Sequence, residues 1–112
     1  MLRQAFYREV KKKKLVIALS LLSEPEILLL DEPFAALDVM TIKNLQKIIV
    51  DLQSSQNISI ILCDHQARDL LACVDLAAII NNGKVIAQDT PGILIQNIEA
   101  KNVYFGDSFK IN

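Results

Sequence analysis

The chain has 112 residues, of which 52% are hydrophobic and 22% charged, and its formal net charge is −1. This composition is typical of a globular protein and excludes a disordered one, and the length allows one domain at most. The nearly neutral charge gives no general electrostatic case for binding nucleic acid or an anionic membrane. No apolar stretch reaches the ~20 residues of a membrane-spanning helix, and no signal peptide is evident, so we expect a cytoplasmic protein.

The first half of the chain predicts a helix, a strand and a second helix. Apolar spacing predicts the first helix over about residues 4–23, and we interpret Lys11–Lys14 as its solvated face, with a patch for phosphate or lipid headgroups as the alternative. The aliphatic run 27–30 predicts a strand buried on both faces. Asp38 is placed to cap the second helix. Its apolar positions recur at helical spacing: Ile42, Leu45, Ile48, Ile49 and Leu52.

The second half continues this alternation. A strand is predicted over 58–63, a short helix over 66–73 and a further strand over 76–80. The order of elements predicts an α/β fold with a parallel sheet and flanking helices. We interpret Cys63 and Cys73, which have apolar neighbours, as small core residues in a reducing compartment.

A hairpin is predicted near the end of the chain. Asparagine and glycine within residues 81–84 predict a tight turn, after which a fourth strand, 85–88, pairs back on the third. A short helix is expected to begin with Pro91. The aromatic residues of 101–112 predict a tail that docks.

Ionisable side chains follow the first two predicted strands. Asp31 and Glu32 end the first strand, Asp38 lies on the next loop, and His65 follows the second strand. Because the carboxyl ends of parallel strands meet at one edge of a sheet, we expect these groups to converge. Such a set suits transfer of a phosphoryl group to water, with carboxylates for Mg²⁺ and for the water and a histidine for the γ-phosphate. Considered alone, Glu32 is interpreted as an acid on the surface, and His65 as a loop histidine whose hydrogen bonds are satisfied.

Several stretches, in the right order, resemble one family. Residues 28–33, Leu-Leu-Leu-Asp-Glu-Pro, with Ala-Leu-Asp at 36–38, resemble the Walker B motif and D-loop of ATP-binding cassette (ABC) ATPases. Asp-His at 64–65 resembles their switch-histidine loop. Asn-Gly-Lys-Val at 82–85 and Thr-Pro at 90–91 resemble the hairpin and helix start that close their domain. A phosphatase or nuclease of another family, built on the acids and the histidine alone, is the less favoured alternative.

The tail, residues 102–109, and Phe34 after the Glu-Pro pair narrow the resemblance to the ATPase subunits of lipopolysaccharide exporters. This resemblance implies ATP and Mg²⁺ as cofactors, with Asp31 holding Mg²⁺ through water and Glu32 as the general base. It implies that His65 contacts the γ-phosphate and that Asp38 works across a dimer interface. The resemblance also implies membrane permease subunits as partners, together with either a second copy of the chain or an N-terminal half-domain. It implies no nucleic acid. Bound to a permease, the protein would lie peripherally at the inner membrane.

Other family motifs are missing. The phosphate-binding pattern G-x-x-x-x-G-K-[ST] occurs nowhere, no Q-loop precedes the first helix, and the chain contains three glycines. Tyr7–Val10 stands where the resemblance places the glycine-containing signature. In the family's sheet the Walker A strand separates the strand before His65 from strand 76–80. We therefore expect a gap in the sheet, which the chain either closes by pairing its own strands or tolerates at a cost in stability.

We therefore predict a partial P-loop NTPase fold, a truncated ABC ATPase domain. Residues 1–23 form a degraded signature region and helix, 24–98 run from Walker B to the hairpin and last helix, and 99–112 form the tail. The family role is ATP hydrolysis that drives lipopolysaccharide export, and we expect the chain by itself to be inactive. Two alternatives stay open: a binding module that complements a separately encoded N-terminal half, and a non-functional gene remnant. The sequence leaves the transported substrate open.

Overall fold

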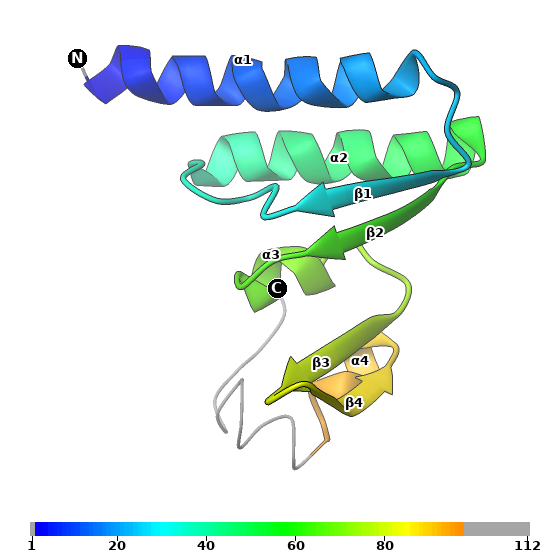
Figure 1. Ribbon diagram of the computed structural model, residues 1–112. Coiled ribbons are helices and arrows are strands. Elements are labelled where there is room, and N and C mark those ends of the chain that lie inside the picture. Colours follow the sequence, from blue (N-terminus) through cyan, green and yellow to red (C-terminus); the bar gives the residue numbers. More distant parts are fainter. Residues whose placement is uncertain (1, 98–112) are drawn as a thin grey trace. The chain divides into compact units, whose positions relative to one another are not determined.

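The computed structural model describes residues 2–97, with side chains at residue 8 and over residues 11–97 (Figure 1). The elements in chain order are α1 (Leu2–Leu21), β1 (Ile27–Asp31), α2 (Val39–Gln56), β2 (Ser59–Cys63), α3 (Ala67–Leu71), β3 (Ala77–Asn81), β4 (Lys84–Asp89) and α4 (Pro91–Leu94). The chain divides into two compact units, Met1–Gln66 and Ala67–Asn112. The docked tail predicted for 101–112 lies outside the described residues, and the predicted boundaries within a single domain stay predictions.

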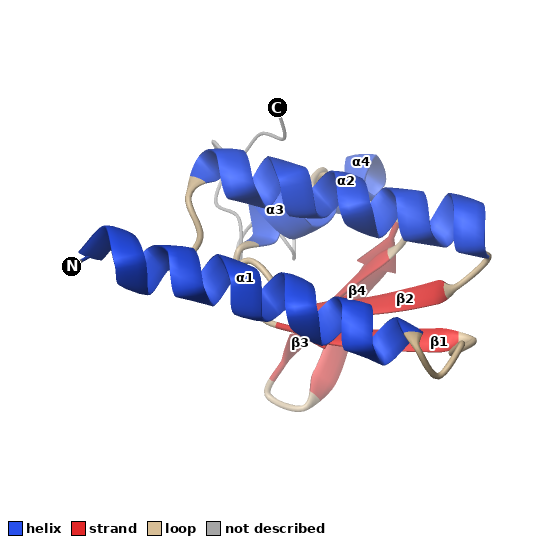
Figure 2. Ribbon diagram, turned by 90° about the horizontal axis from the view of Figure 1, so that it is seen from above, coloured by secondary structure: helices blue, strands red, loops and turns tan. Residues whose placement is uncertain are grey.

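The first unit is built on a parallel sheet of two strands. β1 and β2 pair in register, from Ile27 opposite Ser59 to Asp31 opposite Cys63. Helix α2 covers one face of this sheet and α1 runs beside β1 (Figures 1 and 2). Both strands therefore end at the same edge, where the sequence places its ionisable side chains.

Only one face of this sheet is buried, so the prediction of burial on both faces is wrong. Leu28 is buried, whereas Ile27 and Leu29 are 59% and 70% exposed. Successive side chains of a strand point to opposite faces, and α2 covers just one of them. The buried hydrophobic residues of this unit are Ile17, Leu28, Phe34, Ile42, Leu45, Ile49 and Ile58.

Helix α2 confirms the predicted capped helix. Asp38 has an extended backbone, and its Oδ1 accepts a hydrogen bond from the Thr41 amide at 3.0 Å. The buried residues of α2 fall on the predicted apolar face: Ile42, Leu45 and Ile49. The helix stops at Gln56 because Asn57 takes a left-handed conformation, with φ of 54°.

Helix α1 ends two residues earlier than predicted. Glu24 takes a left-handed conformation with φ of 51°, and its amide donates to the Leu21 carbonyl at 3.0 Å, which closes the helix before Pro25. None of the helices within residues 2–97 combines the length and the apolar character that crossing a bilayer requires.

The second unit contains the predicted hairpin. β3 and β4 pair in an antiparallel sheet, and the turn between them has positive φ at Asn82 (50°) and Gly83 (74°). Such turns match the twist of the flanking strands, and asparagine and glycine adopt them most readily. The core of this unit consists of Leu71, Ile79, Ala87 and Leu94.

The strands of residues 2–97 thus form two separate sheets of two strands each. β3 pairs with β4 alone, so the parallel sheet contains two of the three strands that the sequence assigned to it. The expected gap is consistent with this arrangement, because β2 and β3 are not hydrogen-bonded neighbours.

Both cysteines are free, and Cys63 is exposed, so its interpretation as a core residue is wrong. Cys63 lies on the exposed side of β2, in phase with Ile61. Cys73 is half-buried. Burial, and then the charge of Asp69, raise the pKa of the Cys73 thiol to about 11.

Candidate active site

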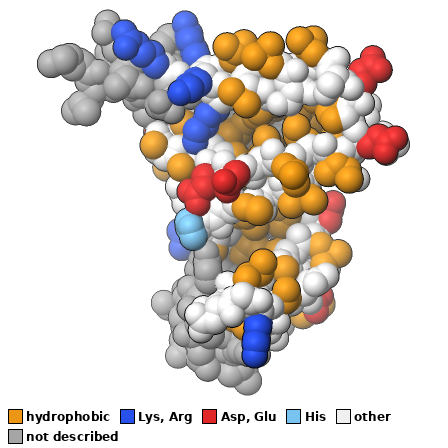
Figure 3. Space-filling view, viewed as in Figure 1, with side chains coloured by type: hydrophobic (Ala, Val, Ile, Leu, Met, Phe, Trp, Pro, Cys, Tyr) orange, Lys and Arg blue, Asp and Glu red, His pale blue; other side chains and the backbone are white. Residues whose placement is uncertain are grey.

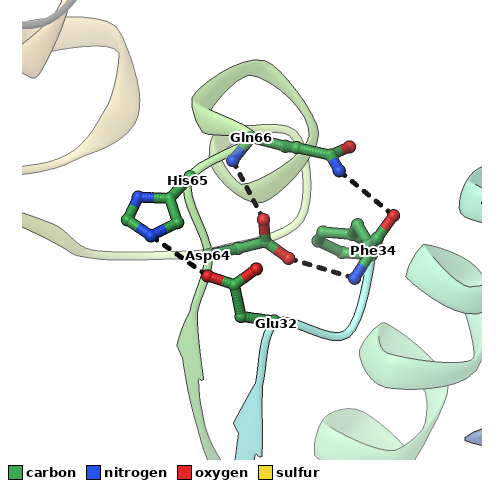
Figure 4. A network of polar contacts seen from close by, with 5 residues as sticks. All are labelled: Glu32, Phe34, Asp64, His65 and Gln66. Atoms are coloured by element: carbon green, nitrogen blue, oxygen red, sulfur yellow. Dashed lines mark hydrogen bonds and ion pairs between the residues drawn. The ribbon is translucent and has the colours of Figure 1, made fainter. Parts of the chain in front are cut away.

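The chain turns sharply where β1 ends. The Glu32 amide donates to the Cys63 carbonyl at 2.6 Å, which extends the strand pairing by one bond beyond Asp31. Glu32 itself has φ of 54°, a left-handed conformation that side chains other than glycine rarely adopt. From this turn its carboxylate points toward the segment that follows β2 (Figure 4). Unusual backbone conformations of this kind gather at functional sites.

Glu32 and His65 are in direct polar contact at this edge. Glu32 Oε1 lies 3.2 Å from His65 Nε2 (Figure 4). The His65 side chain is 88% exposed and that of Glu32 43%, so both remain accessible to a ligand and to water. The structure therefore brings together two of the residues predicted from sequence, and they are 33 positions apart in the chain.

Asp64 joins the two loops beneath this pair. Its Oδ2 accepts from the Phe34 amide at 3.0 Å, and its Oδ1 accepts from the Gln66 amide at 2.9 Å. Gln66 adds a second bond between the two loops, because its side-chain Nε2 donates to the Phe34 carbonyl at 3.2 Å (Figure 4). The ring of Phe34 is fully buried and anchors the loop in the core. Sequence reasoning assigned no role to Asp64 or Gln66, although a carboxylate just after a strand is a signal for such local bonds.

Lys13 reaches the same turn from α1. Its Nζ donates to the carbonyls of Glu32 (3.3 Å), Pro33 (3.1 Å) and Ala35 (2.6 Å). Lys11, Lys12 and Lys14 are exposed, as predicted for a solvated face, but Lys13 is half-buried. The interpretation of the run as wholly solvated is therefore wrong at this one position.

Asp38 caps the N-terminus of α2. Its carboxylate is exposed, and hydrogen bonds from the side chain and then the amide of Thr41 lower the pKa of Asp38. These contacts account for Asp38 as a helix cap, and its role across a dimer interface stays a prediction.

Asp31 and Glu32 fit a magnesium ion that is held mainly by a nucleotide. Mg²⁺ keeps several waters and takes one or two carboxylates plus substrate phosphates rather than a full protein cage. Within residues 2–97 no group of three or more His, Cys, Asp or Glu residues is arranged to hold a metal. Asp31 is exposed at the strand end, and with Glu32 it borders a pocket of about 320 Å³ that Lys12, Lys13 and apolar side chains also line.

Comparison with known sequences points to ABC transporters. The chain is 35% identical to the lipopolysaccharide export system ATP-binding protein LptB of Haemophilus influenzae over 101 residues, which is 90% of this chain and 42% of that protein. It is 34% identical to LptB of Escherichia coli over the same coverage. The chain thus spans less than half the length of these relatives. No protein-family model matches it.

Solved structures agree on the fold. The chain superposes with a TM-score of 0.75 on cbiO1 of Clostridium perfringens, part of the ABC transporter complex cbiONQ, at 32% identity over 83% of this chain and 37% of that one. It superposes with a TM-score of 0.76 on MJ1267, an ATP-binding cassette of an ABC transporter, at 19% identity over 88% of this chain and 40% of that one. In sequence the chain is therefore similar to part of the ATP-binding subunits of ABC transporters, and its fold is that of part of an ABC ATPase domain.

Proposed function

We propose that the chain carries the water-activating half of an ATP-hydrolysing site. In this proposal Asp31 holds Mg²⁺ through water, Glu32 accepts the proton of the attacking water, and His65 donates a hydrogen bond to the γ-phosphate. The observation that carries it is the 3.2 Å contact between Glu32 and His65 at the end of two parallel strands. The contact places a base and a hydrogen-bond donor next to each other at an exposed edge; in this proposal the attacking water and the γ-phosphate lie beside the pair, because no atom fits between two groups 3.2 Å apart.

The 112 residues contain no phosphate-binding half for such a site. None of its three glycines belongs to a Walker A pattern, whose backbone amides would cradle the phosphates. We therefore expect the chain alone to bind ATP weakly and to turn over none. The base and the histidine act only when another segment holds the nucleotide against them.

A graft tests this proposal. Residues 24–97 would replace the matching segment of the Haemophilus influenzae relative, which supplies the remaining motifs of the domain. We expect the graft to hydrolyse ATP, and Glu32→Gln to lower its rate by about 10²- to 10⁴-fold, the usual contribution of a general base. Glu26→Gln, at an exposed acid that precedes β1, is the matched control and should leave the rate unchanged. A graft that binds ATP without hydrolysing it would refute the proposal.

The biological role follows from the relatives by analogy. We propose that the hydrolysis drives lipopolysaccharide export through permease subunits in the inner membrane, with a second ATP-binding domain across a dimer interface near Asp38. Support comes from the names of similar curated proteins, which are lipopolysaccharide export subunits. Co-purification of permease subunits with the graft, compared with the intact relative, tests this role.

A second candidate function is a binding module that complements a separately encoded N-terminal half. The observation in its favour is the uncovered face of the parallel sheet, where Ile27, Leu29 and Ile61 are 50–70% exposed. Figure 3 shows hydrophobic side chains gathered over β1, β2 and α1 on this side of the unit. A contiguous apolar surface of this kind favours a partner.

Co-purification tests the second candidate. A tagged N-terminal half of the relative, carrying its Walker A motif, should retain the chain, and Leu29→Glu should abolish retention. Val50→Glu, at an exposed apolar residue of α2, is the control and should bind normally. A chain that neither works in the graft nor binds this half would favour the remaining alternative, a non-functional gene remnant.

A further inference from the structure

Lys13, in a run of four lysines, binds the turn that follows β1. Its ammonium group carries three N–H donors and no acceptor. Three carbonyl oxygens, of Glu32, Pro33 and Ala35, lie within 3.3 Å of it. The number of donors matches the number of acceptors, and the three acceptors come from a single turn 19 to 22 residues further along the chain.

This turn contains two residues in conformations that need support. Glu32 has φ of 54° and Ala36 has φ of 60°, and neither is a glycine. Left-handed residues with side chains persist only where surrounding contacts hold them. A contact that restrains this turn therefore changes which backbone conformation the turn adopts.

Several groups hold the turn at its amides and at its carbonyls. Asp64 accepts from the Phe34 amide, and the Cys63 carbonyl accepts from the Glu32 amide. The carbonyls of Glu32, Pro33 and Ala35 are bound by Lys13. Without Lys13 the amide contacts remain, as do the bonds from the Ala35 amide to the Glu32 carbonyl (3.3 Å) and from Gln66 to the Phe34 carbonyl, but the carbonyls of Pro33 and Ala35 lose the donor that ties them to α1.

We propose that Lys13 is a positioning residue for Glu32: it fixes the turn that directs the Glu32 carboxylate toward His65. Its importance for catalysis rests on the proposed function of Glu32, but its effect on the turn can be measured in the chain by itself. The contribution is specific to a cation with several N–H donors at this helix position. Arginine can supply it, whereas methionine, which has a similar apolar stem, cannot.

Nuclear magnetic resonance can measure directly how Lys13 affects the position of the Glu32 side chain. His65 is the only histidine of the chain, so its ring signals are unambiguous. We expect a cross-relaxation peak between the His65 ring protons and the Glu32 γ-methylene in the unmodified chain and in Lys13→Arg. The peak should disappear in Lys13→Met. Lys14→Met removes the same charge from an exposed neighbour and should keep the peak.

Hydrogen exchange separates positioning from general support. In Lys13→Met the amides of Glu32 and Phe34 should exchange at least about tenfold faster, while the amides of α2 at Leu45 and Ile49 stay within about twofold of the unmodified chain. Equal loss of protection in α2, or complete unfolding, would overturn the proposal, because Lys13 would then support the whole unit. An unchanged peak in Lys13→Met would also overturn it. If Glu32 is not a general base, that result appears only in the activity of the grafted enzyme. The cross-relaxation peak and the exchange rates of the chain by itself are then unaffected.

Discussion

Asp31 and Cys63 lie opposite each other as the last paired residues of β1 and β2. The parallel register means that the residues just beyond them, Glu32 and Asp64-His65, leave the sheet side by side. The 3.2 Å contact between Glu32 and His65 is therefore a consequence of strand register rather than of local sequence. A shift of one residue in that register would turn one of the two side chains toward the opposite face of the sheet.

Replacement of His65 by alanine in the grafted enzyme should lower kcat by about 10²-fold, the usual effect of removing one donor that stabilises developing charge. The KM for ATP should change less, because other groups hold most of the nucleotide. Steady-state kinetics measure both constants. Lys84→Ala, at an exposed residue of the hairpin, is the control. An unchanged kcat would remove His65 from the proposed site.

Asp64→Asn should destabilise the first unit, because the Asp64 carboxylate accepts from two amides, those of Phe34 and Gln66. An asparagine presents one oxygen and one NH₂ group, so one of the two amides would face a donor. Leaving a part-buried donor unmatched costs about 1–3 kcal/mol. Urea unfolding followed by circular dichroism measures the loss. Asp75→Asn, at an exposed residue, provides the comparison, and equal effects from both variants would contradict this explanation.

Local signals in the sequence predict a large part of this fold. Asp38 as a cap, the apolar face of α2 and the Asn82-Gly83 turn depend on neighbouring residues only, and the structure confirms them. The ends of β1 and β2 are equally local, since each aliphatic run stops at an aspartate. These signals sufficed to predict the edge at which Glu32 and His65 meet.

Other features depend on packing that no local pattern encodes. Leu28 and Leu29 are identical in type, and only the position of α2 buries the first and exposes the second. Lys13 stands among identical neighbours, so its contact with the turn depends on the helix phase of α1 relative to β1. Asp64 belongs to the recognised Asp-His pair, but its bond to Phe34 appears only once β1 and β2 are paired.

Asp38→Ala should lower the stability of α2 in a manner that depends on pH. Hydrogen bonds from the side chain and the amide of Thr41 lower the pKa of Asp38 below its ordinary value of 3.8, so the folded state favours the ionised carboxylate. A lowered pKa adds stability above the ordinary value, and this stability is lost as the pH falls through the folded pKa. The melting temperatures of the unmodified chain and the variant should therefore differ at pH 7 and converge below pH 3.8. A difference that persists undiminished at lower pH would show that the carboxylate charge is not the source.

The two cysteines should differ strongly in reactivity toward a thiol reagent. With a pKa of about 11, only ~10⁻³ of Cys73 is thiolate at pH 8, and the thiolate is the reactive form. Burial slows the reagent further, whereas Cys63 is exposed. Cys73→Ser, which retains Cys63, should therefore react at least about 100-fold faster than Cys63→Ser, which retains Cys73. Denaturing both variants in urea supplies the control, because the rates should then become similar. Similar rates in the folded chains would contradict the half-buried position of Cys73 and the pKa that follows from it.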